Sequence, residues 1–387
     1  MIAANRLATV QEYYFSKKLQ EVNEMRAKGC NIINMGIGSP DLPPPIEAIE
    51  ALTNCMADPN SNGYQSYRGL PELREAMAQF YAYHFDVDLN PKTEILPLMG
   101  SKEGIMHISM AFLNPGDQVL IPNPGYPTYE SVCRLVEAVP IFYDLDHSLG
   151  WMPNLPLLEQ TDLSKVKLMW INYPHMPSGA KASSKILSDL VAFAKKHQIL
   201  LVNDNPYSLI LNEQPLSLLR IPGAFDCCLE LNSISKTFNM SGWRVGMVVG
   251  DKTLIDDILK VKSNMDSGMF YGLQKGSIVA LKSGTNWFQS LNKTYNDRRQ
   301  LVWQMADALG GHYDKDTAGM FVWLKLPPGI NSMDFSDKIL KDYYIFTTPG
   351  DIFGSNGQGY LRLSLCLDSG HIIKAIERIQ QKSKHPT

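Results

Sequence analysis

The sequence has 387 residues, of which 44% are hydrophobic and 19% are charged, and its formal net charge is −3. A chain of this length and composition is typical of a globular protein with two domains, or with one large α/β domain and an appendage. The charge excludes a basic surface for nucleic acid and a polybasic patch for a membrane. The six cysteines include no C-x-x-C pair, so we expect reduced thiols and no metal site.

The N-terminal stretch MIAANRLATVQEYYFSKKL lacks the apolar core of a secretory signal peptide. No stretch of the sequence approaches the roughly 20 apolar residues that a membrane-spanning helix needs. We therefore expect a cytoplasmic protein. Residues 6–28 have the spacing of a helix that Gly29 would end, whereas residues 35–45 (MGIGSPDLPPP) contain too much glycine and proline for a regular element.

From about residue 46, helical patterns alternate with short apolar runs that we predict to be strands. The predicted strands are residues 117–122 (DQVLIP), 166–172 (VKLMWIN), 199–204 (ILLVND) and 227–233 (CCLELNS). Helices are predicted at residues 128–137 and 183–198, and the second has a serine at its start and one apolar face. This alternation is typical of an α/β domain in which helices cover both faces of a mostly parallel sheet.

The pattern changes near residue 290. A long predicted helix leads to two apolar segments, residues 319–327 (GMFVWLKLP) and 359–367 (GYLRLSLCL), and a last helix is predicted at 369–381. We interpret this part as a smaller α+β domain. The expected division is therefore an N-terminal segment (1–45) that joins the small domain, a large domain (46–289) and a small C-terminal domain (290–387).

Polar side chains follow two of the predicted strands, at the sheet edge where open α/β proteins bind ligands. Asp204 ends one strand, and Tyr207 follows three residues later. Lys236 follows the strand at 227–233 and has mainly apolar neighbours. Burial would lower the pKa of its amine from about 10.4 and free it to attack a carbonyl. Taken singly, these residues also fit a turn carboxylate and a surface lysine.

A third stretch, residues 100–104 (GSKEG), precedes a helical run. Amides at the start of a helix bind phosphate, although the same start is also ordinary helix capping. Pyridoxal 5′-phosphate needs a lysine, a carboxylate for its ring nitrogen, a phosphate site and a wall for its ring. Lys236 can supply the lysine, Asp204 the carboxylate and Tyr126 the wall for the ring. The phosphate site can be formed by the turn Gly100–Ser101–Lys102, completed by Ser233, Ser235 and Arg244. The sequence therefore predicts this cofactor.

These residues are part of a longer series of motifs. They are NMGIGSPDLPPP, GYQSYRGLPELREA, GSKEGI, PNPGYPTY, DNPYS, SISKTFNMSGWRVG, KSNMDSGMF, GMFVWLKLP, and PGDIFG followed by GYLRLSL. In their order and spacing, from about residue 30 to the C-terminus, the chain resembles the class I and II aminotransferases of fold type I, which include aspartate, alanine and LL-diaminopimelate aminotransferases. The resemblance implies a pyridoxal-phosphate-dependent transaminase that moves an amino group between an L-amino acid and a 2-oxo acid.

The resemblance also implies roles for the residues around the cofactor ring. Lys236 would form a Schiff base with the cofactor and then move a proton at the α-carbon of the substrate. Asp204 would pair with the ring nitrogen and keep it protonated. Tyr207 would donate a hydrogen bond to the phenolic oxygen of the ring, and Tyr126 would stack on its face.

Other residues would hold the phosphate and the substrate. The resemblance assigns the phosphate to Gly100, Ser101, Lys102 (through its backbone), Ser233, Ser235 and Arg244. Arg362 and the amide of Gly38 would bind the α-carboxylate, for which a planar guanidinium is well suited. Tyr64 would reach the phosphate of the neighbouring subunit, so a homodimer is part of the prediction.

One stretch departs from the family pattern. Family members carry an asparagine before the Pro-Thr-Gly turn, but NYPHMPSGA places Met176 there, directly after His175. A thioether cannot donate a hydrogen bond. We therefore expect cofactor binding to survive, the pKa of the Schiff base to rise and the grip on the substrate to weaken, with His175 as the neighbour that could compensate.

Two alternatives stay open. A β C–S lyase acting on cystathionine-like substrates would use the same scaffold but would release pyruvate and ammonia. A cofactor-binding regulator with little turnover is the second alternative, which Met176 keeps open although the sequence shows no basic helix-turn-helix. The sequence does not identify the side chain of the amino donor.

Overall fold

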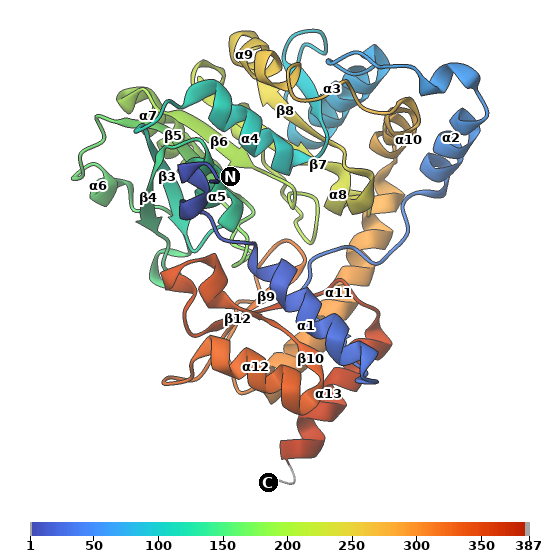
Figure 1. The fold of residues 1–387 in the computed structure, drawn as a ribbon, viewed down its shortest axis with the longest axis vertical. Coiled ribbons are helices and arrows are strands. Elements are labelled where there is room, and N and C mark those ends of the chain that lie inside the picture. Colours follow the sequence, from blue (N-terminus) through green and yellow to red (C-terminus); the bar gives the residue numbers. More distant parts are fainter. Residues whose placement is uncertain (1, 384–387) are drawn as a thin grey trace.

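A computed structural model describes residues 2–383 and has two lobes, of which the larger lies at the top of Figure 1. The larger lobe is built on a seven-stranded sheet in the order β2-β8-β7-β6-β5-β3-β4. The strands are β2 (Ile95–Leu98), β3 (Gln118–Asn123), β4 (Val139–Asp144), β5 (Val166–Ile171), β6 (Leu200–Asp204), β7 (Cys228–Ser233) and β8 (Gly246–Gly250). Only β8 runs antiparallel to its neighbours, β2 and β7, so the predicted mostly parallel sheet is confirmed.

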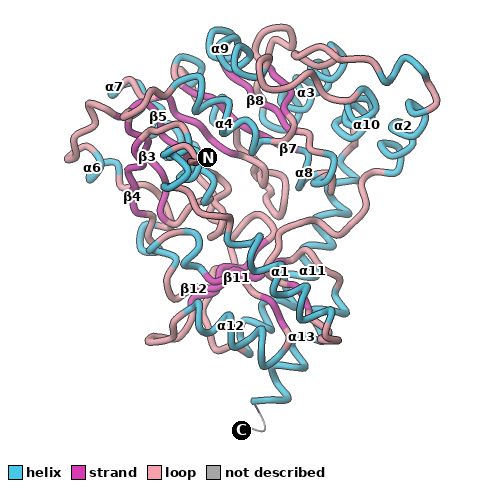
Figure 2. The backbone as a smooth tube through the Cα atoms, viewed as in Figure 1, coloured by secondary structure: helices cyan, strands magenta, loops and turns pink. Residues whose placement is uncertain are grey.

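Helices cover both faces of this sheet, as Figure 2 shows by colour. One apolar core joins the sheet to α4 (Ser101–Phe112), α5 (Pro127–Leu135) and α9 (Lys252–Lys262). The opposite face packs on α3 (Pro71–Phe85), α7 (Ser184–His197) and α10 (Tyr271–Leu281), with α2 (Ile46–Met56) beside α10. Successive strand residues alternate between the two cores, as Leu120 and Ile121 do, because side chains on a strand point to opposite faces.

The smaller lobe contains a three-stranded antiparallel sheet in the order β11-β12-β9. Its strands are β9 (Phe321–Lys325), β11 (Thr348–Pro349) and β12 (Tyr360–Ser364), and its helices are α11 (Thr285–Ala308), α12 (Ser332–Tyr343) and α13 (Ser369–Ser383). The long α11 runs from the larger lobe into the smaller one (Figure 1). Two short helices, α6 (Leu155–Leu158) and α8 (Ile234–Thr237), belong to the larger lobe.

The N-terminal segment packs on the smaller lobe. Strand β1 (Ile33–Asn34) pairs in parallel with β10 (Ile345–Phe346), and α1 (Tyr14–Ala27) contributes Phe15 and Val22 to a core shared with Leu340. Residues 5–9, which precede α1, lie against α5 of the larger lobe (Figure 1), so the described chain passes between the lobes three times, near residues 10, 40 and 285. The domain boundaries at residues 45/46 and 289/290 remain predictions.

The predicted helix at residues 6–28 is wrong in its first third. Residues 5–9 form a 3₁₀ turn, the next residues are extended, and α1 begins only at Tyr14. None of residues 5–9 is buried, so no packed apolar face stabilises a helix there. No helix within residues 2–383 is both long enough and apolar enough to cross a bilayer.

Candidate active site

A cavity of about 520 Å³ lies where the carboxyl ends of β6 and β7 face the smaller lobe. Its lining includes every predicted site residue except Gly100 and Tyr64. Gly100 lies directly behind it, against Arg244, whereas the Tyr64 side chain is 93% exposed and contributes nothing to the cavity of its own chain. The sheet topology therefore gathers residues from widely separated parts of the sequence, as expected for the strand ends of an open α/β sheet.

Lys236 sits on α8, the short helix that directly follows β7. Its Nζ donates a hydrogen bond of 2.5 Å to the carbonyl oxygen of Gly38. Burial lowers the pKa of Lys236 below its ordinary value of 10.5, and the cations Arg362 and Arg244 lower it further. Both effects increase the fraction of neutral amine, the form that attacks a carbonyl carbon and accepts a proton.

Asp204 is the last residue of β6 and is buried. Its Oδ2 accepts a hydrogen bond of 3.0 Å from Tyr129, whose ring is stacked on Trp170, while its Oδ1 has no hydrogen-bond partner among residues 2–383. Burial raises the pKa of Asp204 to about 6, against a weaker lowering effect of the Tyr129 hydrogen bond. A buried carboxylate with one unpaired oxygen is suited to a cationic N–H donor, such as a protonated pyridine nitrogen.

The amino end of α4 and the loop after β7 form a second part of the cavity. Within the described part of the chain, no side chain caps the first amides of α4. Opposite them, the Ser233 hydroxyl donates to Ser235 Oγ at 2.7 Å and accepts from the Ser235 amide at 3.1 Å. Uncapped helix amides beside two hydroxyls and the Arg244 guanidinium form a site for an anion such as a phosphate.

Gly100 allows Arg244 to approach the start of α4. Its φ is +89°, and a Cβ at this position would lie 2.1 Å from Nη2 of Arg244. Arg244 itself has a φ of 55°, and its Nη1 donates to the carbonyl of Ser241 at 2.9 Å. A glycine is therefore required at residue 100 both by its backbone conformation and by the space that the guanidinium occupies.

Arg362, on β12, is a buried guanidinium with few polar partners. Its Nη2 donates to the carbonyl of Gly36 at 2.9 Å and its Nη1 contacts the Met176 sulfur at 3.2 Å, while Nε has no partner among the described residues. The rings of Phe321 and Phe353 lie 4.0 and 4.8 Å from its central carbon. Burial lowers the pKa of Arg362 to about 10. A buried cation with a free N–H group favours binding of a carboxylate.

Two tyrosines complete the predicted set. Tyr126 and Tyr207 both line the cavity, and Tyr207 makes an edge contact with Phe321 at 6.0 Å between ring centres. Burial raises the pKa of both phenols, so each hydroxyl stays protonated and able to donate a hydrogen bond.

Of the stretch that departs from the family pattern, Asn172 and Met176 line the cavity. The Met176 sulfur contacts Arg362, and the Met176 amide donates to Oδ1 of Asn172 at 2.8 Å. His175 points away, since its Nδ1 lies 2.7 Å from the Ser178 hydroxyl and its Nε2 lies 3.1 Å from the Pro124 carbonyl. Burial lowers the pKa of His175 to about 4, so the ring is neutral. The expectation that His175 could compensate for Met176 is wrong, because both ring nitrogens are already engaged outside the cavity.

Several lining residues were missed in the sequence. Tyr13 and Phe15 reach the cavity from the start of α1, and Phe321 reaches it from β9. Asn172 ends the predicted strand at 166–172, and its amide nitrogen donates to the backbone carbonyl of Asp204. Its position at a strand end was the one signal that could have identified it.

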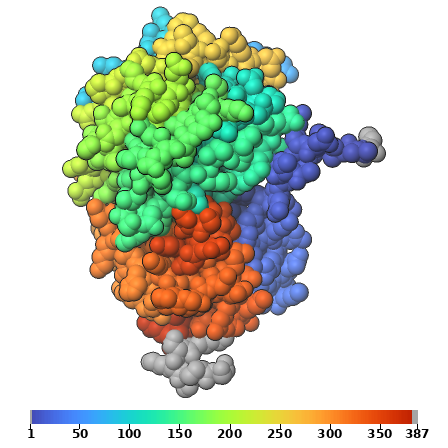
Figure 3. Space-filling view, turned by 90° about the vertical axis from the view of Figure 1, so that its left-hand side faces the viewer, coloured from blue at the N-terminus to red at the C-terminus, as the bar shows by residue number. Residues whose placement is uncertain are grey.

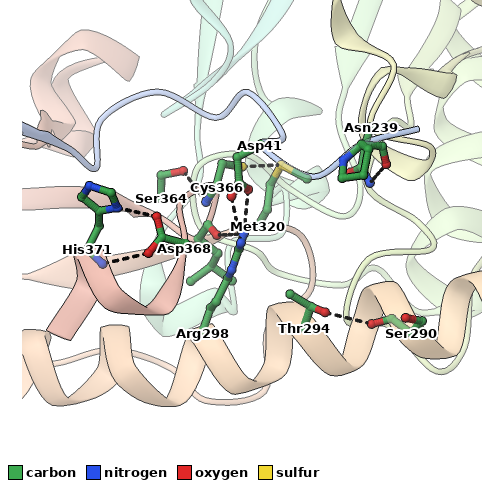
Figure 4. A network of polar contacts seen from close by, with 12 residues as sticks. Asp41, Asn239, Ser290, Thr294, Arg298, Met320, Ser364, Cys366, Asp368 and His371 are labelled. Atoms are coloured by element: carbon green, nitrogen blue, oxygen red, sulfur yellow. Dashed lines mark hydrogen bonds and ion pairs between the residues drawn. The ribbon is translucent and has the colours of Figure 1, made fainter. Parts of the chain in front are cut away.

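An ion pair, also missed, holds the strap of residues 36–45, which contributes Ile37, Gly38 and Ser39 to the cavity lining. Figure 4 shows this pair between Asp41 and Arg298. Both terminal guanidinium nitrogens of Arg298 on α11 donate to the Asp41 carboxylate, at 2.7 and 2.8 Å. The same guanidinium donates to the carbonyl of Leu365 at 3.1 Å, next to the contact of Cys366 with the Met320 sulfur. The strap that carries Gly38 is thus fixed to the smaller lobe.

Three residues of metal-ligand type lie together outside the cavity. The ligand atoms of Glu103, His107 and Asp266 are within 4.8 Å of one another. The ammonium of Lys262 lies 2.8 Å from the Asp266 carboxylate and already supplies a positive charge to this group. Lys262 thus neutralises one of the two carboxylates, which makes the cluster less suited to a divalent cation.

The cavity fits pyridoxal 5′-phosphate on observations of its own atoms. The unpaired Oδ1 of Asp204, the uncapped amides of α4 beside Arg244, and the amine of Lys236 are the complements of a protonated ring nitrogen, a phosphate and an aldehyde. The individual roles predicted for these residues remain proposals.

Comparison with known proteins gives one family. The profile of the family described as aminotransferase class I and II matches residues 31–379. The LL-diaminopimelate aminotransferase of Maridesulfovibrio salexigens is 40% identical over 385 residues, which cover 98% of each chain. Among solved structures, apo BacF from Bacillus subtilis is 36% identical with a TM-score of 0.94, and the match covers 98% of each chain. An aminotransferase from Staphylococcus aureus is 29% identical with a TM-score of 0.90, and the match covers 99% of each chain.

Proposed function

The chain belongs to the class I and II aminotransferases, which use pyridoxal 5′-phosphate, and on this basis we propose that Lys236 holds the cofactor while an amino group moves between an L-amino acid and a 2-oxo acid. The observation that supports this most strongly is the pair formed by a lysine of lowered pKa and a buried carboxylate with one unpaired oxygen in the same cavity. When bound, the cofactor supplies an electron-withdrawing ring that stabilises negative charge on the α-carbon of the donor.

We assign the remaining cofactor contacts to the residues that surround this pair. Asp204 would keep the ring nitrogen protonated, Tyr207 would donate to the phenolic oxygen, and Tyr126 would pack against the ring. The phosphate would be held by Ser101, the Lys102 amide, Ser233, Ser235 and Arg244. The uncapped start of α4 and the close approach of Arg244 to Gly100 support this assignment.

Lys236 is also the group that we propose to move the proton at the α-carbon of the donor. A general base works best when its pKa lies near the working pH, and burial with two nearby cations shifts this lysine in that direction. The Gly38 carbonyl orients the amine through a hydrogen bond of 2.5 Å. The strap pinned by Asp41 and Arg298 therefore sets the position of the base.

Arg362 would bind the α-carboxylate of the donor and exclude water from it. Its guanidinium has unused N–H capacity and is surrounded by the rings of Phe15, Phe321 and Phe353. A charged hydrogen bond is stronger in such a dry site than in water. We also propose that the Gly38 amide contributes to this carboxylate site.

We propose a homodimer in which Tyr64 reaches the neighbouring site. Tyr64 is almost fully exposed, and Met99 and Met265 are partly exposed. Residues near the N-terminus also project from the surface of the molecule, as the dark blue arm in Figure 3 shows. A Tyr64 side chain that is exposed on its own chain is free to contact a second subunit. A location in the cytoplasm remains a prediction.

The half-reaction tests this function. Purified holoenzyme is mixed with single L-amino acids and no 2-oxo acid; LL-diaminopimelate is included because relatives carry its name. An aminotransferase produces one equivalent of the donor's 2-oxo acid per active site and continues only when an acceptor is added. Many equivalents of pyruvate and ammonia from a β-substituted donor would instead identify a lyase, and no product from any donor would favour a regulator.

A further inference from the structure

Cys227 and Cys228 are adjacent in the chain, and their side chains meet where β7 begins. The two sulfurs lie 3.7 Å apart, and this is the one contact between cysteine sulfurs within residues 2–383. Successive side chains of an extended strand point to opposite faces, which would keep adjacent cysteines apart. Cys227 has a ψ of 9°, far from the extended value of about +135°, and this turn of the backbone brings its sulfur to that of Cys228.

The two thiols differ in their access to solvent. Cys228 is fully buried in the core of the larger lobe, whereas Cys227 is partly exposed. Next to Cys227 in the chain, Asp226 forms an ion pair of 2.5 Å with Lys195 of α7. A reagent from solvent therefore meets Cys227 first, beside a cation.

Cys227 also has the greater thiolate character of the two. The hydrogen bond from Cys228, and then the Lys195 ammonium, lower the pKa of Cys227 against the opposing effect of burial. The pKa of Cys228 is raised, first by the same contact and then by burial. Burial raises the pKa of Cys366 too, and that of Cys133 to about 12. The thiolate is the form that reacts with oxidants, and redox-active cysteines are exposed to solvent and next to a second thiol.

From this geometry we infer that Cys227 and Cys228 are a peroxide-sensitive thiol pair, in which Cys227 is oxidised first and Cys228 then closes a disulfide between the two residues. The pair lies at the amino end of β7, whereas Lys236 follows the carboxyl end of the same strand. The inference therefore concerns a second site and does not depend on the proposed function.

The reaction balances with hydrogen peroxide as the co-reactant. The Cys227 thiolate attacks one peroxide oxygen, so that an S–O bond forms, the O–O bond breaks, and the displaced hydroxide takes a proton and leaves as water. Cys228 then gives up its proton and attacks the Cys227 sulfur, so that the S–S bond forms, the S–O bond breaks and a second water leaves. The two sulfurs together lose two electrons, which the peroxide gains. The first step also removes the Cys227 thiolate, whose contact is the largest cause of the raised pKa of Cys228.

A disulfide at this place is strained and therefore easily reduced. Adjacent α-carbons are about 3.8 Å apart across a trans peptide, below the range of about 4.4–6.8 Å that most disulfides span. The Cys227 carbonyl also accepts a hydrogen bond of 3.0 Å from the Leu201 amide, which opposes movement of this peptide. Strained disulfides are typical of reversible thiol pairs and not of structural bridges.

Peptide mass mapping tests the pair in the native holoenzyme and requires no turnover. The protein is treated with hydrogen peroxide, the remaining thiols are alkylated under denaturing conditions, and the tryptic peptide of residues 221–236, which contains both cysteines, is weighed. We expect this peptide to carry no label and to be lighter by two hydrogen atoms than its reduced form, while the partly exposed Cys30 and Cys55 are alkylated. Dithiothreitol added before alkylation should restore both labels. Two retained labels, a Cys227 oxidised to sulfinic acid, or a disulfide to another cysteine would each overturn the inference.

Two variants separate the roles of the two thiols. Cys228→Ser removes the second thiol, so Cys227 should remain a sulfenic acid that dimedone traps, and this adduct should be absent from the native protein. Cys227→Ser removes the attacking thiolate, and Cys228 should then stay unmodified. Cys55→Ser, at a partly exposed cysteine on α2, is the control and should form the disulfide as the native protein does. Equal dimedone adducts in the native protein and Cys228→Ser would show that no disulfide forms, and oxidation of Cys228 in Cys227→Ser would contradict the order of the two steps.

Discussion

Met176 is the residue at which this site departs from its family, and its surroundings define what the departure changes. Its sulfur contacts the Arg362 guanidinium at 3.2 Å and cannot donate a hydrogen bond to an oxygen of the cofactor or the substrate. The neighbouring Asn172 side chain accepts a hydrogen bond from the Met176 amide through Oδ1 and donates one to the Asp204 backbone carbonyl through Nδ2. With methionine at position 176, this side chain supplies no hydrogen-bond donor to the cavity.

Met176→Asn should lower the pKa at which the lysine-bound cofactor deprotonates. The new amide can donate to the phenolic oxygen and stabilise the deprotonated form, with a hydrogen bond worth about 0.5–1.5 kcal/mol, or up to about one pKa unit. A spectrophotometric pH titration of the holoenzyme measures this shift. Met176→Leu, which adds no donor, is the control and should leave the pKa close to that of the native protein; an upward shift in the asparagine variant would refute the prediction.

Asp204 should make the cofactor-free protein less stable as pH rises. Its folded pKa of about 6 lies above the ordinary 3.8, so the folded state holds a proton that the unfolded state has lost between these values. Its contribution to the free energy of unfolding is therefore most favourable below about pH 4 and declines as pH rises through 6, by up to about 3 kcal/mol.

The difference between Asp204→Asn and the native protein isolates this effect. Denaturant unfolding of both cofactor-free proteins at pH 5 and pH 8 should show that the variant gains stability relative to the native protein at the higher pH. Glu47→Gln, at an exposed position on α2, should show no such trend. A relative loss of stability for Asp204→Asn on raising the pH would contradict the assignment.

Lys236 and Asp204 could be placed at the site from the sequence because they lie at or just after the ends of predicted strands. Arg362, which lies within β12, was identified from the motif GYLRLSL instead. Tyr13 and Phe321 were not predictable from the residues alone, because they enter the cavity from α1 and β9 through the packing of the smaller lobe. The prediction for His175 was wrong because the place of a residue in a motif does not reveal which way its side chain points.

At the scale of elements, buried strands were the easiest to predict. The strands β3, β5, β6 and β7 are continuous apolar runs and match their predicted ranges within one or two residues. The two edge strands contain Pro97 and Pro140 and read poorly as strands, because proline lacks the amide for a central ladder. The 3₁₀ turn and the extended residues before α1 were missed because the sequence has helical spacing there, although none of residues 5–9 is buried against a partner.

The junction of β2 and α4 gives a prediction for Gly100. Gly100→Ala should raise the dissociation constant of pyridoxal 5′-phosphate by at least about 10-fold, because a Cβ at this position would displace Arg244 from the phosphate site. Titration of the cofactor-free protein with the cofactor measures the change. The control is Gly116→Ala, which has a similar φ of +87° but nothing within 4 Å of the added carbon. Equal effects of the two variants would show that backbone strain, not displacement of Arg244, is responsible.

The whole molecule is an α/β lobe and a smaller lobe joined by α11 and by the N-terminal segment, and the fold class was predicted from the alternation of elements. The strap of residues 36–45 could not be placed from its sequence, since glycine and proline define no regular element. Its position depends on the ion pair between Asp41 and Arg298, a contact between residues 257 positions apart.

The proposed homodimer should be visible in solution. Light scattering after size-exclusion chromatography should give about twice the chain mass of 43.4 kDa. Tyr64→Ala should leave the dimer intact but weaken cofactor binding, because the tyrosine would contact the phosphate of the other subunit. A monomer that retains its cofactor with native affinity would exclude this part of the proposal.

The attachment of the cofactor to Lys236 is the central claim, and reduction with borohydride followed by peptide mass mapping tests it most directly. After reconstitution with pyridoxal 5′-phosphate, reduced protein should carry one cofactor mass on the peptide that contains Lys236, and Lys236→Ala should carry none at that position. A reconstituted protein that gains no adduct on Lys236, or gains it on a different lysine, would contradict the account.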